Sequence, residues 1–598
     1  RVEFVFFLDA EEHDMSCRIS ARYGERQFML TDDQNDGELL RDKQREAEIL
    51  FLTKQWFPCY DPERRELNCG KDEELMYSVL DRGVEALLAL GEVQCTRRFS
   101  GMNVGRKMRM SVGVSVSGNL LELDIATQDV PPEELLEILK SYRTRKKYHR
   151  LRSGDFLSLE EESLAALDEM LETLRVSPKE LLKGNLKLPL YRALYLDKLL
   201  EKNEEIYSNR DSHFREMVKN FKTVKDAGFE VPKSLRGVMR SYQKTGYRWL
   251  RLLEEYRLGG ILADDMGLGK TLQVTAVLLA AKEEGRSATS LVVTPASLVY
   301  NWGEELKRFA PELSCCFITG SQDERAQKLE QYNSFDVIVT SYDLLKRDIS
   351  SYEDKEFYYQ IIDEAQYIKN HTTAAAKAVK AIRSTVRYAL TGTPIENRLS
   401  ELWSIFDFLI PGYLYGYEVF KNTFETPIVK GEEQTALERL QRMTAPFILR
   451  RLKENVLRDL PEKLEENRYV KFEGEQQKVY DAQVVRMRQK LVMQNAEEFK
   501  KEKLQILAEL MKLRQICCDP GLCFENYGGE SAKLDACVEL VKSAVEGGHK
   551  ILLFSQFTSM LELLAARLAQ EKVSFYTITG DTPKEKRLQL VKAFNKDE

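Results

Sequence analysis

The sequence has few metal-ligating side chains, with only ten cysteines and five histidines in 598 residues. The cysteines are scattered apart from the adjacent pairs Cys315–Cys316 and Cys517–Cys518, and no CxxC pair or zinc-finger spacing occurs. This pattern excludes a structural zinc site in the sequence. It indicates reduced cysteines that mostly serve packing in a cytosolic protein.

Long apolar runs are also missing. No stretch approaches the roughly 20 apolar residues that a membrane span needs, and no signal peptide opens the chain. We therefore expect a cytoplasmic protein without a membrane partner. Because the first residue is Arg1, we also expect that the natural start lies upstream.

Positive charge is not in excess, since the net charge is -7. This argues against a broadly basic protein that coats DNA, but it leaves room for a local nucleic-acid cleft with a few phosphate-binding donors. Hydrophobic residues make up 43% and charged residues 31%, a balance typical of soluble cores. At roughly 100–200 residues per domain, the length predicts three or more domains.

Residues 1–175 carry the pattern of an α+β accessory domain. Met108–Ala126 alternates apolar and polar residues around a turn at Ser117–Asn119, which predicts a hairpin. A helix should follow Pro131–Pro132. The run Arg143–Arg152 holds six lysines or arginines; it could contact phosphates, or it could be a solvated helix end of the kind common on surfaces.

A helical, charged connector is expected over 176–230, and from Val231 onward short apolar strands alternate with helices. The predicted strands are Leu258–Leu262, Ser290–Thr294, Asp336–Thr340, Tyr359–Ile362 and Arg387–Leu390. This alternation predicts an α/β fold with a parallel sheet. Residues 400–450 and 474–516 have the pattern of long helical insertions.

A second βα unit is predicted from Lys550–Phe554 and Val573–Thr579, with a helix running to Glu598. The expected domains after the connector are therefore a first ATP-binding lobe with a helical protrusion over 231–455, a linker with a helical insertion over 456–545, and the start of a second lobe over 546–598. The sheet of that second lobe should have an unpaired edge after Val573–Thr579.

The strongest chemical signal is the segment ADDMGLGKT at 263–271, which follows a predicted strand and opens a helix. Glycines let the backbone wrap a phosphate, the helix N-terminus directs N–H groups toward it, and Lys270 supplies a positive charge. Thr271 is placed to hold Mg²⁺. The strict GxxxxGK[ST] pattern fails at one position, because Asp264 stands where the first glycine belongs.

A second signal is the segment DEAQ at 363–366, directly after the strand Tyr359–Ile362. At the carboxyl end of a strand, Asp363 can hold the metal, and Glu364 can orient or deprotonate the attacking water. An acidic pair alone often only caps a helix. On the same sheet as the glycine loop, it predicts a second half of a nucleotide site.

These motifs occur in a series that resembles the Swi/Snf-type ATPases, helicase-related DNA translocases of helicase superfamily two. The resemblance spans about Val231 to Glu598 and rests on the segments ADDMGLGKTLQ (263–273), VVTPASLVYNW (292–302), TSYDLL (340–345), IIDEAQYIKN (361–370), LTGTPIENRLSELWSIFDFL (390–409), PFILRRLKENVLRDLPEK (446–463), LRQICCDPGL (513–522) and KILLFSQFTSMLELL (550–564). The DEAQ spelling and the segments Cys17–Tyr23 and Lys147–Leu159 are similar to bacterial members with an N-terminal Snf-associated domain.

The resemblance implies a RecA-like first lobe, ATP and Mg²⁺ as cofactors, and roles for single residues. Gln243 should read adenine, although the family usually has Leu and Pro where Met239 and Ser241 stand. The remaining nucleotide-binding positions are Asp265, Met266, Gly267, Leu268, Gly269, Lys270 and Thr271. Coupling between lobes falls to Gln366, Thr391, Gly392 and Thr393. The implied nucleic-acid contacts are Thr294, Ser297, Asn301, Thr340, Ser341 and Ser555, any of which could instead cap a helix or close a turn.

The implied activity is that of a DNA-dependent ATPase that moves along double-stranded DNA and remodels DNA-bound protein complexes such as transcription machinery. A bacterial, nucleoid-associated location would follow. Two other functions stay open: a strand-separating helicase or restriction-type motor, and a nucleotide-gated DNA-binding scaffold. The first usually has a Ser-Ala-Thr turn where this chain has Thr391–Thr393, and the second is disfavoured by the intact Lys270 and Glu364.

The arginines that reach the γ-phosphate in this family belong to a late motif of the second lobe, and the sequence ends before such a motif. Arg450 and Arg451 do not replace them, because they belong to the segment between the lobes. An arginine finger contributes roughly 10³–10⁵ in rate. We therefore expect a truncated second lobe, and weak hydrolysis by these 598 residues alone.

Overall fold

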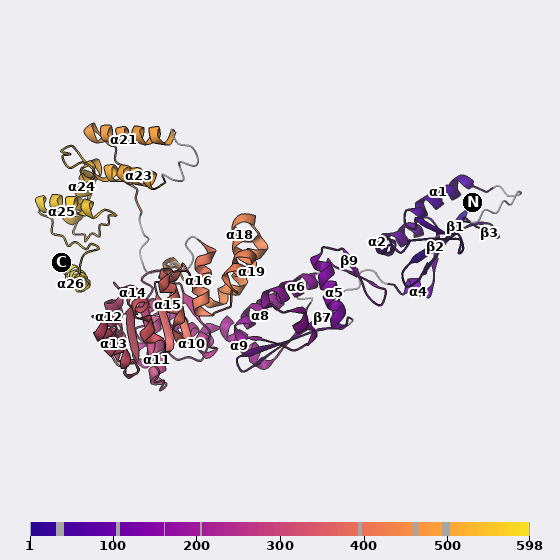
Figure 1. The fold of residues 1–598 in the computed structure, drawn as a ribbon, viewed down its shortest axis with the longest axis horizontal. Helices are drawn as coiled ribbons and strands as arrows, with labels where there is room; N and C mark the ends of the chain where they lie inside the picture. The colour runs from indigo at the N-terminus through magenta and orange to yellow at the C-terminus, as the bar shows by residue number, and fades with distance from the viewer. Residues whose placement is uncertain are drawn as a thin grey trace. The chain divides into compact units, whose positions relative to one another are not determined.

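The computed structural model describes residues 2–31, 41–102, 108–128, 130–160, 162–203, 206–392, 398–457, 465–492 and 503–596. The chain divides into two compact units, Arg1–Arg458 and Asp459–Glu598. Figure 1 labels their helices and strands.

The first unit begins with a mixed sheet that has its own hydrophobic core. Its strands, in spatial order, are β4 (Cys59–Asp61), β5 (Glu66–Asn68), β2 (Met15–Tyr23), β1 (Glu3–Ala10) and β6 (Glu92–Cys95), with β3 (Arg26–Met29) on β2. Alternate residues of β1 such as Phe4, Phe6 and Leu8 are buried, because successive side chains of a strand point to opposite faces. Helices α1 (Lys43–Lys54) and α2 (Glu73–Ser78) contribute Ile49 and Met76 to the same core.

The predicted hairpin is confirmed as β7 (Met110–Ser117) and β8 (Leu120–Thr127), which pair antiparallel around a turn with Gly118 at φ +60°. The predicted helix after Pro131 is confirmed as α5 (Pro132–Arg143). The hairpin belongs to a second sheet in the order β11 (Leu186–Pro189), β8, β7, β12 (Tyr207–Arg210).

The expectation of a helical connector over 176–230 is wrong in part. The segment does contain α8 (Ala193–Lys202) and α9 (Ser212–Lys222), but β11 pairs with β8 and β12 with β7. A four-residue strand is too short to give a clear alternation, so only its partners reveal it. The segment completes the sheet of the preceding hairpin and belongs to the same domain.

Residues 1–175 also differ from the single domain expected, because they contribute to two hydrophobic cores. The first core is built from residues up to Phe99 together with Phe156, and the second begins at Met108 and continues into the following lobe. A small hairpin of β9 (Tyr148–Arg150) and β10 (Phe156–Ser158) joins the two. Phe156 is buried in the first core, and Tyr148 stacks on Tyr77 with ring centroids 4.5 Å apart.

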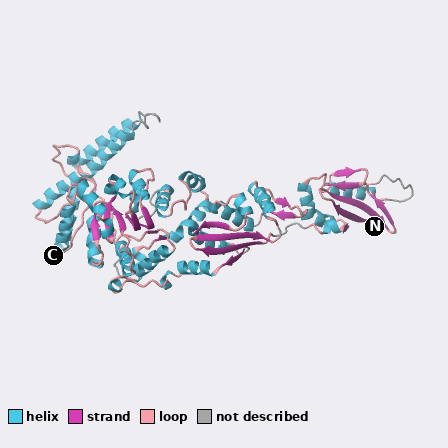
Figure 2. Cartoon of the chain, turned by 60° about the horizontal axis from the view of Figure 1, so that its bottom comes forward, coloured by secondary structure: helices cyan, strands magenta, loops and turns pink. Residues whose placement is uncertain are grey.

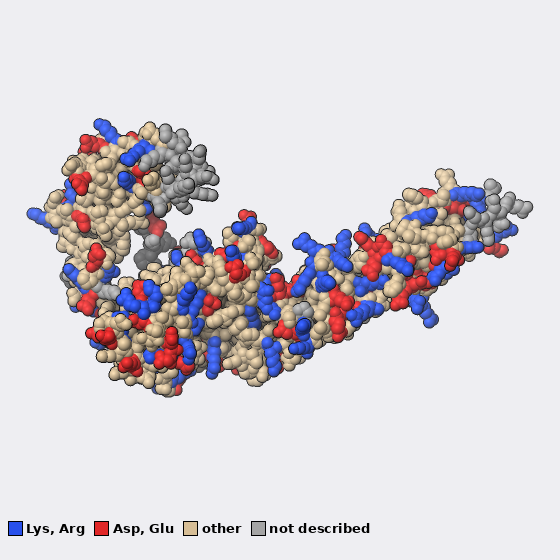
Figure 3. Space-filling view, viewed as in Figure 1, with Lys and Arg blue, Asp and Glu red and all other residues tan. Residues whose placement is uncertain are grey.

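Three arginines of the basic run at 143–152 lie in ion pairs with acidic neighbours. The pairs are Arg143–Asp168 at 2.7 Å, Arg150–Glu73 at 3.6 Å and Arg152–Glu137 at 3.3 Å. These contacts favour the surface interpretation of this run. Figure 3 shows basic and acidic side chains interspersed over the face that it draws.

The predicted parallel sheet is confirmed, with seven strands in one direction. Their spatial order is β15 (Cys315–Phe317), β16 (Val337–Ser341), β14 (Ser290–Thr294), β17 (Glu356–Asp363), β18 (Arg383–Leu390), β13 (Gly260–Leu262) and β19 (Ile448–Leu449). The five predicted strands correspond to β13, β14, β16, β17 and β18. The edge strands β15 and β19 were not predicted, because two or three residues carry no readable pattern.

Two groups of helices flank this sheet (Figure 1). One consists of α10 (Ser241–Glu255), α11 (Lys270–Glu283) and α12 (Val299–Phe309), and the other of α14 (Tyr342–Arg347), α15 (Ala374–Ala381) and α16 (Leu399–Leu409). Figure 2 shows the helices around the strands. Because both faces of the sheet are covered, a central strand such as β14 is buried at every position.

The helices predicted within 400–450 are confirmed as α16, α17 (Tyr417–Phe420), α18 (Thr426–Gly431) and α19 (Gln434–Thr444). These helices pack directly on α6 (Glu162–Leu174) of the N-terminal part of the unit. Arg439 of α19 pairs with Glu172 of α6 at 2.9 Å, and the Tyr415 hydroxyl donates to the Thr173 carbonyl at 2.6 Å.

In the second unit, all the regular secondary structure of the described residues is helical, and loops connect the helices. It contains α21 (Gly474–Val492), α23 (Lys503–Cys518), α24 (Ala532–Glu546), α25 (Thr558–Gln570) and α26 (Lys584–Lys596). The long helices predicted over 474–516 are therefore confirmed where described. Across all the described ranges, no helix is both long and apolar enough to cross a membrane.

The two strands predicted in the second unit, and with them the unpaired edge after Thr579, are not formed in residues 503–596 as described. Lys550–Phe554 and Val573–Thr579 make no ladder, and Leu552 and Phe554 are 71% and 87% exposed. A strand is stabilised by its neighbours, and an apolar run without such a neighbour does not become one.

Candidate nucleotide site

The carboxyl ends of β13 and β17 bring the two predicted chemical motifs to the same edge of the sheet. The strand β13 leads into the loop at 263–269, and β17 ends at Asp363. Both strands pair with β18, and Leu390 of β18 lies opposite Leu262 and Asp363. Ligands of parallel α/β sheets bind at this edge.

The glycine loop adopts the backbone that its sequence predicts. Gly267 and Gly269 have φ values of +83° and +77°, a region that glycine enters without steric cost. Gly269 immediately precedes α11, so the free N–H groups of the helix N-terminus face the loop. Leu268 is buried, whereas Met266 is 61% exposed.

Lys270 folds back onto its own loop. Its Nζ donates to the Asp264 carbonyl oxygen at 2.7 Å. Burial lowers the pKa of Lys270, although the carboxylates of Glu364, Asp264 and Asp363 act in the opposite direction. A desolvated ammonium group beside a helix N-terminus is well suited to bind a phosphate.

Asp363 is held firmly by its neighbours at the end of β17. Its Oδ2 accepts a hydrogen bond from Trp302 Nε1 at 2.8 Å and from Thr294 Oγ1 at 3.4 Å. The Tyr342 hydroxyl donates to the Asp363 carbonyl at 2.7 Å. Burial raises the pKa of Asp363, and Glu364 adds to that rise, while the Trp302 hydrogen bond opposes it. A nearby cation would favour the ionised form.

Glu364 has a positive φ of +52°, which is uncommon for a residue with a side chain. Its Oε2 accepts a hydrogen bond from Gln366 Nε2 at 2.8 Å, and Gln366 Oε1 accepts one from the Thr391 hydroxyl at 3.2 Å. Thr391 follows β18 and is fully buried. A continuous chain of hydrogen bonds therefore runs from the candidate base to the neighbouring strand.

The remaining two residues of the predicted coupling turn are Gly392 and Thr393. Gly392 lies against Met266 of the phosphate loop, since a Cβ added to it would come 3.3 Å from the Met266 Cγ. Thr393 lies outside the described residues. Gly392 therefore brings the turn into contact with the phosphate loop.

The oxygen atoms of the side chains around Thr271 suit a magnesium ion as ligands. Thr271 lies in the first turn of α11 and is hydrogen-bonded to Glu305 of α12, and burial raises the pKa of Glu305. Asp363 also acts on Glu305 electrostatically. Mg²⁺ prefers oxygen ligands and is held by one or two carboxylates together with substrate phosphates and water. Thr271 and Asp363 offer such a set.

Gln243 lies beside the loop, as the resemblance implies. It is 7% exposed, its Nε2 donates to the Leu268 carbonyl at 3.0 Å, and its Oε1 accepts from the Arg240 backbone N–H at 2.8 Å. The amide thereby caps α10 and fixes the phosphate loop. Adenine recognition by Gln243 stays a prediction.

The six predicted nucleic-acid contacts separate into buried and accessible positions. Thr294, Thr340 and Ser341 are at most 2% exposed, and Ser341 caps α14 by accepting from the Leu344 N–H. Their side chains are therefore not available to a DNA backbone in this conformation. Ser297 and Asn301, before and within α12, are exposed.

Ser555 is the sixth predicted contact and lies in the second unit. Its hydroxyl is half-buried, donates to the Phe557 carbonyl at 3.2 Å and accepts from the Phe557 N–H at 3.2 Å. It closes the turn that precedes α25, which is the structural alternative to a DNA contact.

Three residues at the site were not predicted as functional: Trp302, Glu305 and Arg451. Trp302 and Glu305 lie three residues apart on α12, so both face the sheet edge from the same side of the helix. Their spacing within the segment NWGEE was a signal that could have identified them. Arg451 lies 187 residues from its partner Asp264, and no local pattern joins the two.

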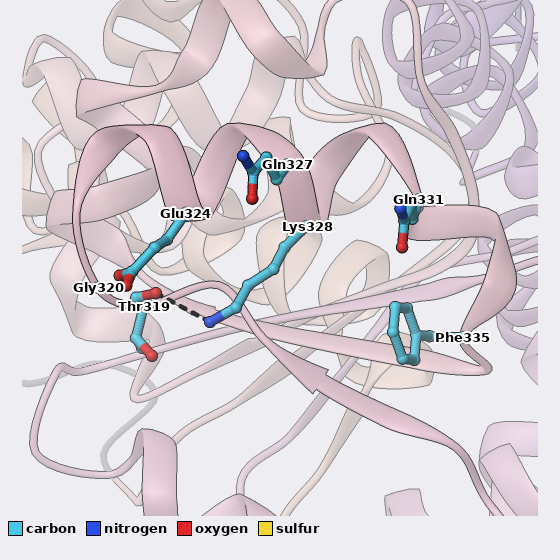
Figure 4. Close-up of a pocket in the computed structure, with 7 residues that line it drawn as sticks. All are labelled: Thr319, Gly320, Glu324, Gln327, Lys328, Gln331 and Phe335. Carbon is cyan, nitrogen blue, oxygen red and sulfur yellow. Dashed lines mark hydrogen bonds between the residues drawn. The ribbon is translucent and has the colours of Figure 1, made fainter.

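A separate hollow lies beside the outer strand β15 and α13 (Gln322–Glu330) (Figure 4). It is lined by Thr319, Gly320, Glu324, Gln327, Lys328, Gln331 and Phe335. Lys328 Nζ donates to the carbonyls of Phe317 and Thr319, both at 3.0 Å. Its ammonium group thus serves the local backbone.

Comparison with protein families identifies three matching regions. Residues 1–232 match the family described as bacterial SNF2 helicase associated. Residues 242–522 match the SNF2-related domain, and residues 532–598 match the helicase conserved C-terminal domain. The second match contains the phosphate loop and the DEAQ segment.

Individual relatives agree with these matches. An uncharacterized ATP-dependent helicase of Mycoplasma genitalium is 37% identical over 358 residues, which are 60% of this chain and 34% of the relative. The TATA-binding protein-associated factor MOT1 of Saccharomyces cerevisiae is 31% identical over 463 residues, 66% of this chain and 25% of MOT1. The chain thus spans about a third or less of the length of these relatives.

Among solved structures, the SWI2/SNF2 ATPase core of Sulfolobus solfataricus in complex with double-stranded DNA is 37% identical to this chain. The match covers 62% of this chain and 78% of the archaeal one, with a TM-score of 0.38. Because this score is low, the sequence matches carry the assignment.

Proposed function

The chain belongs to the SNF2 family of ATP-dependent helicases, and we propose that it is the motor region of a translocase that hydrolyses ATP to move along double-stranded DNA. The observation that carries this proposal is the hydrogen-bonded chain from Glu364 through Gln366 to Thr391. It joins the candidate catalytic base to the turn that the family uses for coupling. A nucleotide-binding domain without motor action needs no such connection.

In this mechanism, Lys270 leaves the Asp264 carbonyl and binds the β- and γ-phosphates of ATP within the loop at 263–269. Thr271 and Asp363 would hold Mg²⁺, which would neutralise negative charge on the phosphates. Glu364 orients the attacking water and accepts its proton. Its backbone is left-handed, and such strained residues concentrate at active sites.

The change at the phosphates reaches the rest of the lobe through Glu364. When Glu364 receives a proton, its carboxylate becomes a weaker acceptor for Gln366, so the hydrogen bond to Thr391 is altered as well. Thr391 and Gly392 follow β18, and Gly392 lies against Met266 of the phosphate loop. Nucleotide state can thereby change the turn at 391–392.

DNA would contact the lobe near α12. Ser297 and Asn301 are exposed there and can donate hydrogen bonds to phosphate oxygens. The same helix carries Trp302, which holds Asp363, so the DNA side and the metal side of the site share one rigid element. Contacts to phosphates predict binding that follows the duplex without reading its sequence.

We further propose that the whole protein uses this movement to displace or rearrange proteins bound to DNA. Family membership and the likeness to MOT1, whose name describes association with the TATA-binding protein, support this function. Because the chain covers about a third or less of these relatives, the proposal of a protein target concerns the whole protein and not these residues alone.

The test compares ATP hydrolysis and movement in the full-length protein. Double-stranded DNA should stimulate hydrolysis more than single-stranded DNA, and the protein should displace a triplex-forming strand without separating an ordinary duplex. Equal stimulation by both DNA forms, together with strand separation, would assign the protein to the strand-separating helicases instead.

Glu364→Gln provides the test of the catalytic assignment. It should lower hydrolysis by about 10²–10⁴ because the general base is lost, while Mg·ATP binding persists. If the variant hydrolyses ATP at the wild-type rate, Glu364 is not the base. The proposal for DNA movement would then need another coupling residue.

A further inference from the structure

A buried ion pair connects the phosphate loop to the chain segment that leads out of the first unit. Asp264, the residue that replaces the first glycine of the loop, is fully buried. Arg451 approaches it with the Nε–Nη2 edge of its guanidinium group, so that Nε donates to Oδ1 at 2.8 Å and Nη2 donates to Oδ2. This two-pronged geometry is the strongest form of an arginine–carboxylate contact.

Further contacts surround this pair on every side. Arg451 Nη1 donates to the Tyr242 carbonyl, and the guanidinium carbon lies 5.2 Å from the centre of the Tyr242 ring. Gln273 accepts from Arg451 Nη2 at 2.7 Å and donates to Asp264 Oδ2 at 3.1 Å. Both oxygens of the Asp264 carboxylate therefore have donors.

The backbone reinforces the same connection. β19 runs parallel to β13, the Ala263 N–H donates to the Leu449 carbonyl at 2.7 Å, and the Asp265 N–H donates to the Arg451 carbonyl at 3.0 Å. In return, the Asp265 carboxylate accepts from the Lys453 N–H at 3.0 Å. The backbone groups of residues 449, 451 and 453 thus make three hydrogen bonds to the loop, at Ala263 and Asp265.

Asp264 serves two partners at once. Its carboxylate binds Arg451, and its carbonyl accepts the hydrogen bond from Lys270. The space for this arrangement comes from Gly246 of α10, because a Cβ there would collide with the Gln273 amide oxygen and come 2.7 Å from Arg451 Nη2. The departure from the glycine pattern at position 264 is therefore matched by surrounding residues.

We propose that Asp264 and Arg451 form a positioning pair that sets the shape of the phosphate loop and transmits nucleotide binding to residues 449–453. This inference rests on the proposed function, because it assumes that the loop binds nucleotide. Arg451 is a positioning residue, since its guanidinium is occupied by Asp264, Tyr242 and Gln273. It does not replace an arginine that contacts the γ-phosphate.

The experiment measures Mg·ADP binding to the 598-residue chain by isothermal titration calorimetry, with circular dichroism as the check of folding. Arg451→Met should weaken binding by at least about tenfold, because it leaves the Asp264 carboxylate without its strongest donor beside the phosphates. Arg450→Met is the matched control, since Arg450 is the exposed neighbour and loses the same charge. It should bind within about twofold of wild type.

The double variant Asp264→Gly/Arg451→Met separates shape from transmission. It removes both charges and restores the usual glycine, so affinity should return to within about threefold of wild type. Hydrogen exchange should still distinguish the double variant from the wild type. Mg·ADP should protect the amides of residues 449–453 in the wild type, and that protection should be lost in the double variant.

Arg451→Lys keeps the positive charge but cannot make the two-pronged contact with Asp264. It also covers the case in which Arg451→Met fails to fold. It should bind Mg·ADP about three- to tenfold more weakly than wild type. If the folded Arg451 variants bind as tightly as Arg450→Met, the pair is only structural and the inference is overturned. Failure of the wild type to bind, or unchanged binding by Lys270→Ala, would instead overturn the proposed function.

Discussion

Apolar runs of similar composition have different fates in the two units of this chain. In the first unit, Leu291, Val292 and Val293 lie in the middle of a seven-stranded sheet and are completely buried. In the second unit, Leu552 and Phe554 lie in a run with the same strand-like pattern, yet they form no ladder and remain mostly exposed. The comparison shows that pairing partners, and not apolar composition alone, turn a run into a strand.

The two units also differ in how they position functional side chains. The first unit places its functional groups at the ends of paired strands, where neighbouring strands fix them to within hydrogen-bonding distance. The small core of the second unit consists of Leu534, Val538, Met560 and Leu564, all from helices. The nucleotide site described above is therefore built from the first unit.

The largest expected effect comes from the lysine of the phosphate loop. Lys270→Ala should raise the Kd for Mg·ATP by more than about 100-fold and abolish hydrolysis, because a charge-assisted phosphate contact is lost. Lys550→Ala in the second unit is the control, since Lys550 is an exposed lysine that donates to the Phe594 carbonyl at 3.0 Å. Equal loss of binding in both variants would contradict the placement of the site.

The next prediction uses one substitution at two positions. Leu291→Ala should destabilise the first unit by about 2–5 kcal/mol, because it leaves a cavity in a buried strand. Leu552→Ala should change stability by about 0.5 kcal/mol or less. All four tryptophans, at 56, 249, 302 and 403, lie in the first unit, so urea unfolding followed by their fluorescence reports that unit alone.

Hydrogen exchange of α25 reports the second unit in the same pair of variants. It should be unchanged by Leu291→Ala in conditions where the first unit stays folded, and nearly unchanged by Leu552→Ala. A large increase in exchange for Leu552→Ala would show that the exposed run is part of a packed structure after all.

A smaller effect is expected from the hydrogen bond that holds Asp363. Trp302→Phe keeps an aromatic ring in the core but removes the Nε1 donor, which should reduce the affinity for Mg·ATP by a free energy of about 1.5–3 kcal/mol. Ser555→Ala in the second unit removes a hydroxyl that only closes a turn and should leave this affinity unchanged. Titration calorimetry with both variants tests the difference, and an unchanged affinity for Trp302→Phe would contradict it.

The smallest expected effect concerns pH. Partial burial of Asp336 opposes its ionisation, but hydrogen bonds from Lys282 and Ser314 outweigh this and lower its pKa below the ordinary value of 3.8. A lowered carboxylate pKa stabilises the fold above that value, and the contribution is lost as pH falls through the pKa of the folded state. Asp336→Asn should therefore destabilise the first unit by about 1 kcal/mol at neutral pH, with the difference shrinking in acid.

Glu571 in the second unit is the counterpart of Asp336. The hydrogen bond from Lys542 at 2.6 Å lowers the pKa of Glu571, but the residue lies exposed on the surface. Glu571→Gln should produce no measurable change in the unfolding stability of the second unit, either at neutral pH or in acid. A pH-dependent loss of stability in this variant would show that the surface pair matters more than its exposure suggests.

Much of the fold was predictable because its signals are local. The apolar runs that became β13, β14, β16, β17 and β18 alternate with helices, and the hairpin of β7 and β8 follows from alternation around a glycine turn. The loop at 263–269 and the DEAQ segment could be placed at one sheet edge for the same reason, since parallel strands end on the same side. The family itself could be recognised from the order of these segments.

The sequence by itself thus determined five of the seven strands of the parallel sheet and where its chemical residues lie along the chain. Only the tertiary structure decided that Asp264 is paired with Arg451, that Trp302 holds Asp363, and that Thr294 and Thr340 are buried. It also decided that 176–230 completes a sheet and that Lys550–Phe554 does not enter one. The physical reason is that each of these outcomes depends on a partner distant in the sequence, and local propensity carries no information about such partners.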